Sequence, residues 1–177
     1  MQLIEINKTL YRKRLNIVIV SFIATLLFLS LGLSSLIISF FGDLVIENSA
    51  GEMEVNNFRY NILGVVLALS ACAAVLHQVK DKLFFKEIYY VWNLKQLHNK
   101  IYRKINKIKL AAKSEDVNAL IILNFYYHSR KQVYLLDDNT LTFPELEKDI
   151  RQLEELTSTL NLTISLSQFD ESLLFQY

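Results

Sequence analysis

The chain has 177 residues, of which 52% are apolar, and a formal net charge of +1 at pH 7. This composition lies between that of a soluble globular protein and that of a multi-span transporter. The single cysteine, Cys72, excludes an intramolecular disulfide and gives almost no support to thiol chemistry. We interpret it as a small packing residue.

Two long stretches without a charged residue dominate the first half of the chain. They cover residues 15–42 and 60–79. Both reach the ~18–20 residues that a helix needs to cross the ~30 Å hydrocarbon layer of a membrane. The first stretch is also about twice as long as the ~7–15-residue apolar core of a signal peptide, so we expect it to be retained. We therefore predict an integral membrane protein with two spans, joined by the loop 43–59.

Charge is segregated along the sequence. Residues 1–14 and 80–113 are strongly basic, whereas the loop 43–59 and residues 114–177 are strongly acidic. Basic residues next to membrane spans usually remain on the cytoplasmic side. We therefore predict that both termini are cytoplasmic and that the acidic loop is external.

Small residues recur at helical spacing in the second span. Gly64, Ala68 and Cys72 are four residues apart and share one face of a helix. Small residues one turn apart allow membrane helices to approach each other closely. We expect this face to pack against the first span in an antiparallel hairpin. Contact with a second copy of the chain is the alternative.

Neither span contains a lysine, an arginine or an acidic residue. Charged groups inside a membrane usually mark ion paths and proton relays, so a transport mechanism loses its main support. The titratable candidate that remains is His77, about one turn before Lys80. At this interface position a histidine is expected to contact water or headgroups, and a proton-relay role has little support.

The region after the second span is predicted to be helical. From Val65 to Phe143 there is neither glycine nor proline, so we expect the second span to continue without a break into a cytoplasmic helix that ends near Lys113. An apolar stripe at heptad-like, coiled-coil spacing supports this helix. The stripe consists of Tyr90, Leu94, Leu97, Ile101, Ile105, Ile108 and Ala112.

Two further helices are expected in the tail. Ser114 marks the start of a helix over Glu115 to about Leu136, which is apolar nearly all round and should be the buried centre of the domain. A turn at 137–139 precedes a helix that begins near Thr142 and ends at about 160. The fold class is thus all-α, with residues 1–79 forming the N-terminal segment and transmembrane hairpin. Residues 80–177 form a cytoplasmic bundle of about three helices.

The last residues have a different pattern. Leu162, Ile164 and Leu166 alternate with polar residues, which is typical of a strand, but one short strand has no partner in this chain. We therefore expect a loosely ordered C-terminal tail.

A search for chemical signatures is mostly negative. All four glycines lie at or before Gly64, so there is no Gly-rich phosphate loop. The histidines at 77, 98 and 128 are far apart and lack the spacing of a metal site. We assign no catalytic, cofactor-binding or metal-binding residue, expect no cofactor, and predict that the protein is not an enzyme.

One histidine has polar and aromatic neighbours with which it could form a small polar site. The set consists of His128, Tyr126, Tyr127, Asp137 and Asp138. A histidine whose hydrogen bond is satisfied by a neighbour on a tyrosine-rich helix is the simpler interpretation. Asn124 on the same helix must be hydrogen-bonded if it is buried, and more often such a residue fixes the helix register.

The basic segment 80–113 has three interpretations. Binding to anionic headgroups suits Lys80 to Lys86, and it extends to the later lysines only if the helix bends down onto the membrane. Binding to nucleic acid lacks a recognised module. Pairing with the acidic residues of 114–177 explains the near-neutral total charge, and we favour it. Whether the segment lies on the membrane or packs against this tail remains open at this stage.

Several short motifs resemble those of domain-of-unknown-function family 3087, a set of small membrane proteins largely from Gram-negative bacteria. The resemblance covers most of the chain up to about Leu160. It implies a two-span architecture in a bacterial inner membrane and carries over no catalytic residue. The motifs are Glu5-Ile6-Asn7-Lys8, Tyr11-Arg12-Lys13, Tyr89-Tyr90-Val91-Trp92-Asn93-Leu94-Lys95-Gln96, Ile101-Tyr102-Arg103-Lys104, Asn118-Ala119-Leu120, Phe125-Tyr126-Tyr127 and Gln132-Val133-Tyr134-Leu135-Leu136-Asp137-Asp138-Asn139-Thr140-Leu141.

The leading hypothesis is a non-enzymatic membrane anchor or scaffold whose helical bundle contacts another protein or a second copy of the chain. The expected partners are thus the lipid bilayer and a protein, with no nucleic acid and no evident small-molecule ligand. An oligomeric pore is the alternative, and an enzyme is the least favoured option. The residues that would line a pore in the first span are Ser30, Ser34, Ser35 and Ser39.

Overall fold

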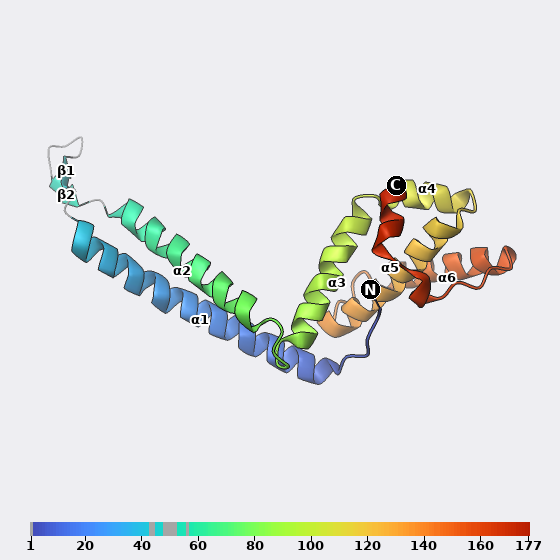
Figure 1. Ribbon diagram of the computed structural model, residues 1–177, viewed down its shortest axis with the longest axis horizontal. Helices are drawn as coiled ribbons and strands as arrows, with labels where there is room; N and C mark the ends of the chain where they lie inside the picture. The colour runs from blue at the N-terminus through green and yellow to red at the C-terminus, as the bar shows by residue number, and fades with distance from the viewer. Residues whose placement is uncertain (1, 43–44, 48–52, 56) are drawn as a thin grey trace. The chain divides into compact units, whose positions relative to one another are not determined.

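The computed structural model describes residues 2–42, 45–47, 53–55 and 57–177. Most of these residues are helical, which confirms the predicted all-α class (Figure 1). The α-helices are α1 (Lys8–Phe41), α2 (Phe58–Val79), α3 (Lys86–Tyr102), α4 (Ile105–Lys113), α5 (Val117–Asp137) and α6 (Phe143–Thr159). Two short 3-10 helices follow, η1 (Leu166–Gln168) and η2 (Glu171–Gln176).

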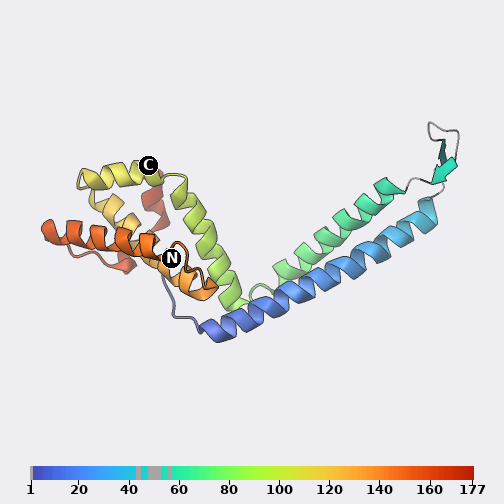
Figure 2. The same cartoon turned by 180° about the vertical axis from the view of Figure 1, so that it is seen from behind.

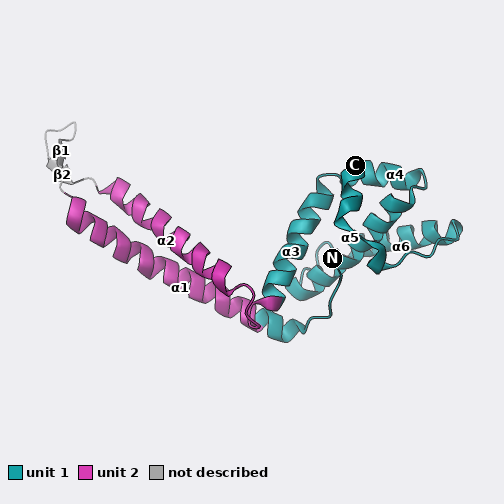
Figure 3. Ribbon diagram, viewed as in Figure 1, with its two compact units in different colours: residues 1–12, 87–177 teal, residues 13–86 magenta. Residues whose placement is uncertain are grey.

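The chain forms two compact units (Figure 3). One unit comprises Met1–Arg12 and Glu87–Tyr177, and we call it the C-terminal unit. The other, Lys13–Lys86, is the hairpin unit and contains most of α1 and all of α2. Between α1 and α2 the strands β1 (Val45–Glu47) and β2 (Met53–Val55) pair antiparallel.

The two helices of the hairpin unit lie side by side along their length, as Figures 1 and 2 both show. The buried residues of α2 are Gly64, Ala68 and Cys72, the three small residues that the sequence placed on one face. A Cβ atom at Gly64 would lie 2.2 Å from the Ser34 Oγ atom of α1. The small face therefore serves helix packing within the hairpin.

The predicted uninterrupted helix from the second span to Lys113 is wrong. Helix α2 ends at Val79 and α3 begins at Lys86, and a second break separates α3 from α4. The turn between α2 and α3 allows Phe84 and Phe85 to line an apolar pocket of about 260 Å³ with side chains of α1 and α2. Tertiary packing of these two aromatic rings explains the first break, because no glycine or proline is present there.

Helix α5 is the centre of the C-terminal unit, as predicted. Eleven of its residues are buried, including Phe125, Tyr126 and Tyr127. The helix begins two residues later than expected, because Asp116 is the N-cap and accepts hydrogen bonds from the backbone of Asn118 and Ala119.

The apolar stripes predicted for the neighbouring helices face this core. The buried positions of α3 include Leu94, Leu97 and Ile101, and those of α4 are Ile108 and Ala112. Helix α6 buries Leu146, Ile150 and Leu153. Helical periodicity therefore identified most of the core of the C-terminal unit.

The C-terminal tail packs on the bundle, contrary to the expectation of a loosely ordered end. The rings of Phe169 and Phe125 stack with centroids 4.0 Å apart, and Leu174 of η2 is also buried. The Tyr177 hydroxyl lies 3.0 Å from Asp116 Oδ2. No strand forms at 162–167, because this stretch supplies η1 and an extended connection instead.

The first residues of the chain also belong to the C-terminal unit. Tyr11, in the first turns of α1, is 2% exposed. The Gln132 side chain donates a hydrogen bond of 2.5 Å to the Ile4 carbonyl. Lys8 and Arg12 both pair with the carboxylate of Asp138, the residue that ends α5 in the left-handed conformation. The N-terminal segment is therefore held to the bundle by a buried ring and by two ion pairs.

Candidate functional site

The residues that the sequence singled out do not converge on one site. His128 Nδ1 lies 2.9 Å from the Asn124 carbonyl, which is the neighbour-satisfied histidine that we expected. Asp137 pairs with Lys95 at 2.7 Å, and Asp138 pairs with the N-terminal segment. Within the described ranges, no group of three His, Cys, Asp or Glu side chains is arranged to hold a metal ion.

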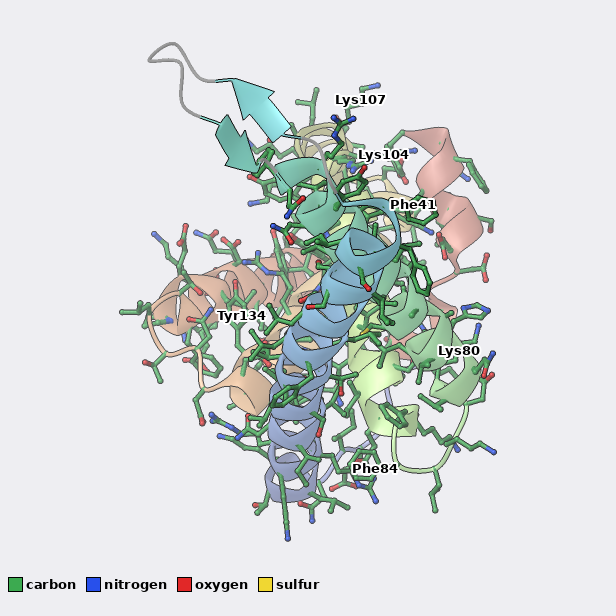
Figure 4. All side chains as sticks on the ribbon, turned by 90° about the vertical axis from the view of Figure 1, so that its left-hand side faces the viewer. Phe41, Lys80, Phe84, Lys104, Lys107 and Tyr134 are labelled. Atoms are coloured by element: carbon green, nitrogen blue, oxygen red, sulfur yellow. The ribbon has the colours of Figure 1, made fainter. Side chains whose placement is uncertain are left out.

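The basic segment makes several contacts with the acidic tail. Lys100 pairs with Glu171 at 2.5 Å, and Lys109 lies 3.6 Å from Asp149. Lys104 and Lys107, both labelled in Figure 4, donate to the backbone carbonyls of the last residues. These contacts agree with internal pairing, the interpretation that we favoured. The exposed ion pairs each contribute about 0–1 kcal/mol, so the packed rings of the tail contribute more.

A buried polar chain lies between α3 and α5. His98 Nε2 is 2.7 Å from the hydroxyl of Ser129, and this hydroxyl donates to the Tyr126 carbonyl at 3.0 Å. Because a hydroxyl has one proton, Nε2 of His98 is the donor to Ser129. Burial, together with the nearby Arg130 and Lys95, lowers the pKa of His98 to about 4. The imidazole is therefore neutral at pH 7 and acts as a structural donor.

The C-terminal unit has a pocket of about 350 Å³ lined by α4, α5 and α6 together with Tyr102 of α3. We call it the tyrosine–arginine pocket. The side chains that define it are Asn106, Lys109, Tyr126, Tyr127, Arg130 and Asp149.

Arg130 is the central cation of this pocket. Its guanidinium donates to the Tyr134 hydroxyl and lies 5.2 Å from the ring centroid of Tyr126 and 5.1 Å from that of Tyr134. Cation–π contacts of this kind contribute about 0.5–2 kcal/mol. Among the described residues, no carboxylate forms an ion pair with Arg130.

The pocket also contains a negative charge, that of Asp149, next to the phenol of Tyr127. Burial raises the pKa of Tyr127, and the negative charge of Asp149 raises it further. The phenol therefore stays protonated, and Asp149 also lies 3.6 Å from Lys109. Asp149 thus has a cationic partner, whereas the partners of Arg130 are aromatic.

The sequence search missed this pocket because its residues come from separate helices. One local signal was present: Tyr126, Arg130 and Tyr134 are four residues apart on a helix that is otherwise mainly apolar. That spacing places an arginine between two aromatic rings on one helical face.

The hairpin unit is the second feature with a functional implication. Helices α1 and α2 are both long and apolar enough to cross a membrane, judged by length and composition. Their outward side chains are apolar, and Phe28 and Phe40 are 73% and 78% exposed. Exposed apolar side chains suit the hydrocarbon layer of a membrane, because no water is present there.

Comparisons with known proteins give one result. A family described as "Protein of unknown function (DUF3087)" matches residues 1–174, nearly the whole chain. Searches among curated proteins and among solved structures give no match. The match includes η1 and the first part of η2, as well as the region up to residue 160 that carries the motifs. The chain therefore belongs to the DUF3087 family of proteins of unknown function.

Proposed function

We propose that this protein is a non-enzymatic anchor or scaffold of the bacterial inner membrane. In this proposal α1 and α2 span the bilayer, both termini are cytoplasmic, and the C-terminal unit presents a surface to a protein partner or to a second copy. The observation that carries the proposal is the contrast between the two units. The hairpin exposes large apolar side chains along both helices, whereas the C-terminal unit buries its own core.

The charge pattern supports the orientation. Arg12, Lys13 and Arg14 precede the uncharged stretch of α1, and Lys80 and Lys82 follow that of α2. Basic residues at these two ends favour the cytoplasmic side, and the acidic loop between the helices favours the outside. The assignment to a Gram-negative inner membrane rests on the resemblance to the family and not on the fold.

The surface of α3 supports a role in protein contact. Trp92 is 52% exposed and stacks on Tyr89, with ring centroids 5.6 Å apart. An exposed tryptophan that is already held in place by a neighbouring ring is typical of interface hot spots, because little side-chain entropy is lost on binding.

Topology is tested with single cysteines in a Cys72→Ala background. Glu47→Cys lies in the loop between the two helices, and Ser114→Cys lies at the end of α4. A membrane-impermeant maleimide should label Glu47→Cys in intact spheroplasts and should label Ser114→Cys only after lysis. The reverse pattern, or release of the protein by carbonate at high pH, contradicts the proposal.

The scaffold role is tested by extraction of the tagged protein in a mild detergent, followed by mass determination. A second polypeptide at matching stoichiometry supports an adaptor. A multiple of 20.6 kDa supports self-assembly. A strictly monomeric protein without a companion, after gentle crosslinking in cells, contradicts both forms of the proposal.

Two of the four serines that would line a pore are already engaged within the hairpin unit, whereas Ser35 and Ser39 are exposed. Ser34 is buried at the Gly64 contact inside the hairpin, and the Ser30 hydroxyl bonds to the Leu27 carbonyl of its own helix. These side chains satisfy their hydrogen bonds within the hairpin unit. Ion flux across the membrane of liposomes that contain the purified protein would support the pore alternative.

A further inference from the structure

The tyrosine–arginine pocket contains a half-buried positive charge whose protein partners are aromatic. The side-chain hydrogen-bond acceptor of Arg130 is the hydroxyl of Tyr134, and Tyr126 contacts the guanidinium through its ring. A guanidinium has five N–H donors, so this acceptor leaves donors for a further group. A cation removed from water without a counter-ion is costly, and the cation–π contacts offset only part of this cost.

The other charges of the pocket do not neutralise Arg130. Lys109 lies 3.6 Å from Asp149, and this pair balances its own charge. Glu145 is exposed in the first turn of α6, where an acidic side chain complements the helix dipole. Within the part of the chain that the structure describes, Glu145 has no ion pair either, but water solvates its exposed carboxylate. The half-buried charge without an ionic partner is therefore that of Arg130, which favours an anionic ligand.

The size and lining of the pocket restrict the ligand further. A volume of about 350 Å³ falls in the range of small organic ligands and exceeds the need of a simple inorganic ion. Tyr126 and Tyr127 are buried in the wall of the pocket, but Tyr102 is 67% exposed and its ring offers a surface for a planar apolar group. Asn106 and Thr142 add polar side chains.

We propose that the tyrosine–arginine pocket binds a small organic oxyanion, a phosphate ester or a carboxylate with a planar apolar part, whose acidic group pairs with Arg130. Arginine suits this role because its planar fork matches phosphate and carboxylate oxygens in two parallel hydrogen bonds. The site lies within the C-terminal unit, so it stands independently of the membrane proposal. A bound ligand would contact α4, α5 and α6 together and give the scaffold a ligand-dependent surface.

The test is calorimetric titration of the full-length protein in a neutral detergent. Phenyl phosphate and benzoate are the complete probes, and inorganic phosphate and phenol each represent one half of the ligand. Phenyl phosphate or benzoate is expected to bind at least about tenfold more tightly than inorganic phosphate or phenol, because both halves contribute. Absence of binding by both complete probes overturns the proposal.

Variants locate the site. R130Q is expected to weaken binding at least about tenfold. K131Q is the matched control, since Lys131 is the next residue but pairs with Glu147 at 3.2 Å and does not line the pocket. Unchanged affinity in R130Q, or an equal loss in K131Q, overturns the assignment. If R130Q does not fold, R130K is measured instead. A loss of affinity of at least about threefold supports paired hydrogen bonds from Arg130 to the ligand, and unchanged affinity refutes them.

The acidic group could come from a soluble molecule or from a lipid headgroup. Nanodiscs of phosphatidylcholine, with and without phosphatidylglycerol, distinguish the two sources. A weaker apparent affinity for phenyl phosphate in the presence of phosphatidylglycerol indicates competition by a headgroup and supports the lipid source. Equal affinity in both nanodiscs supports a soluble anion. Either outcome identifies the source of the acidic group, once the variants have located the site.

Discussion

The rings of Phe125 and Phe169 stack almost parallel, with centroids 4.0 Å apart and planes inclined by 10°. Phe125 belongs to the central helix α5, and Phe169 lies between the two 3-10 helices of the tail. Both side chains are buried, so this contact fixes the last residues of the chain on the bundle. It also explains why a tail with little regular structure is ordered.

Phe169→Ala should therefore destabilise the C-terminal unit. Loss of a buried phenylalanine costs about 3–5 kcal/mol, and the effect at this peripheral site should lie at the lower end because the tail can relax. Thermal unfolding of the full-length protein measures the change. Phe175→Ala is the control, because Phe175 is 87% exposed and its removal should leave the midpoint nearly unchanged. Equal shifts in both variants would refute tail docking.

The contact between Gly64 and Ser34 makes a prediction for the hairpin. A Cβ atom at residue 64 would meet the Ser34 backbone nitrogen at 2.7 Å, so trimming the serine side chain cannot relieve the clash. Gly64→Ala should cost about 1–3 kcal/mol, measured as a lower unfolding midpoint in detergent. Gly32→Ala is the matched control, since nothing lies within 4 Å of a Cβ atom there. A tolerated Gly64→Ala would show that the helices do not approach this closely.

Much of the architecture was predictable because it depends on local patterns. The absence of charge over 15–42 and 60–79 identified the two long apolar helices, and the spacing of Gly64, Ala68 and Cys72 identified their contact face. Apolar residues at helical period identified the buried faces of α3 and α4. Each of these signals is contained within a few turns of one helix.

The features that sequence reasoning missed depend on contacts between distant residues. The break after Val79 follows from packing of Phe84 and Phe85 on the hairpin, which no local breaker announces. The docked tail depends on the distant partner of Phe169. The tyrosine–arginine pocket required three separate helices to be placed before Arg130 and Asp149 could be assigned to one cavity.

The buried ring of Tyr11 predicts that the N-terminal segment is a stable part of the C-terminal unit. Tyr11→Ala should cost about 3–5 kcal/mol if the site does not collapse, and it should free residues 2–12 from the bundle. Hydrogen exchange at the first turns of α1 measures the release. Leu10→Ala is the control, because this neighbouring side chain is 39% exposed. Asp138→Asn should have a smaller effect, since its two ion pairs are exposed and the asparagine retains the left-handed backbone.

The neutral imidazole of His98 predicts how stability depends on pH. Its pKa is about 4 in the folded protein and 6.5 in the reference state, so between these values the unfolded chain binds the proton more readily. The free energy of unfolding should therefore fall as the pH drops from about 6.5 to about 4, with a slope that approaches one proton. Below pH 4 both states are protonated and this contribution becomes constant.

His98→Gln removes the titration and keeps a donor near Ser129, so its stability should depend less on pH over that window. The measurement is chemical unfolding of both proteins from pH 4 to pH 7. The difference in unfolding free energy between wild type and variant should change in favour of the variant as the pH falls. A constant difference across the window would mean that His98 takes up its proton equally in both states. In that case, the buried chain from His98 through Ser129 to Tyr126 would not hold the imidazole neutral.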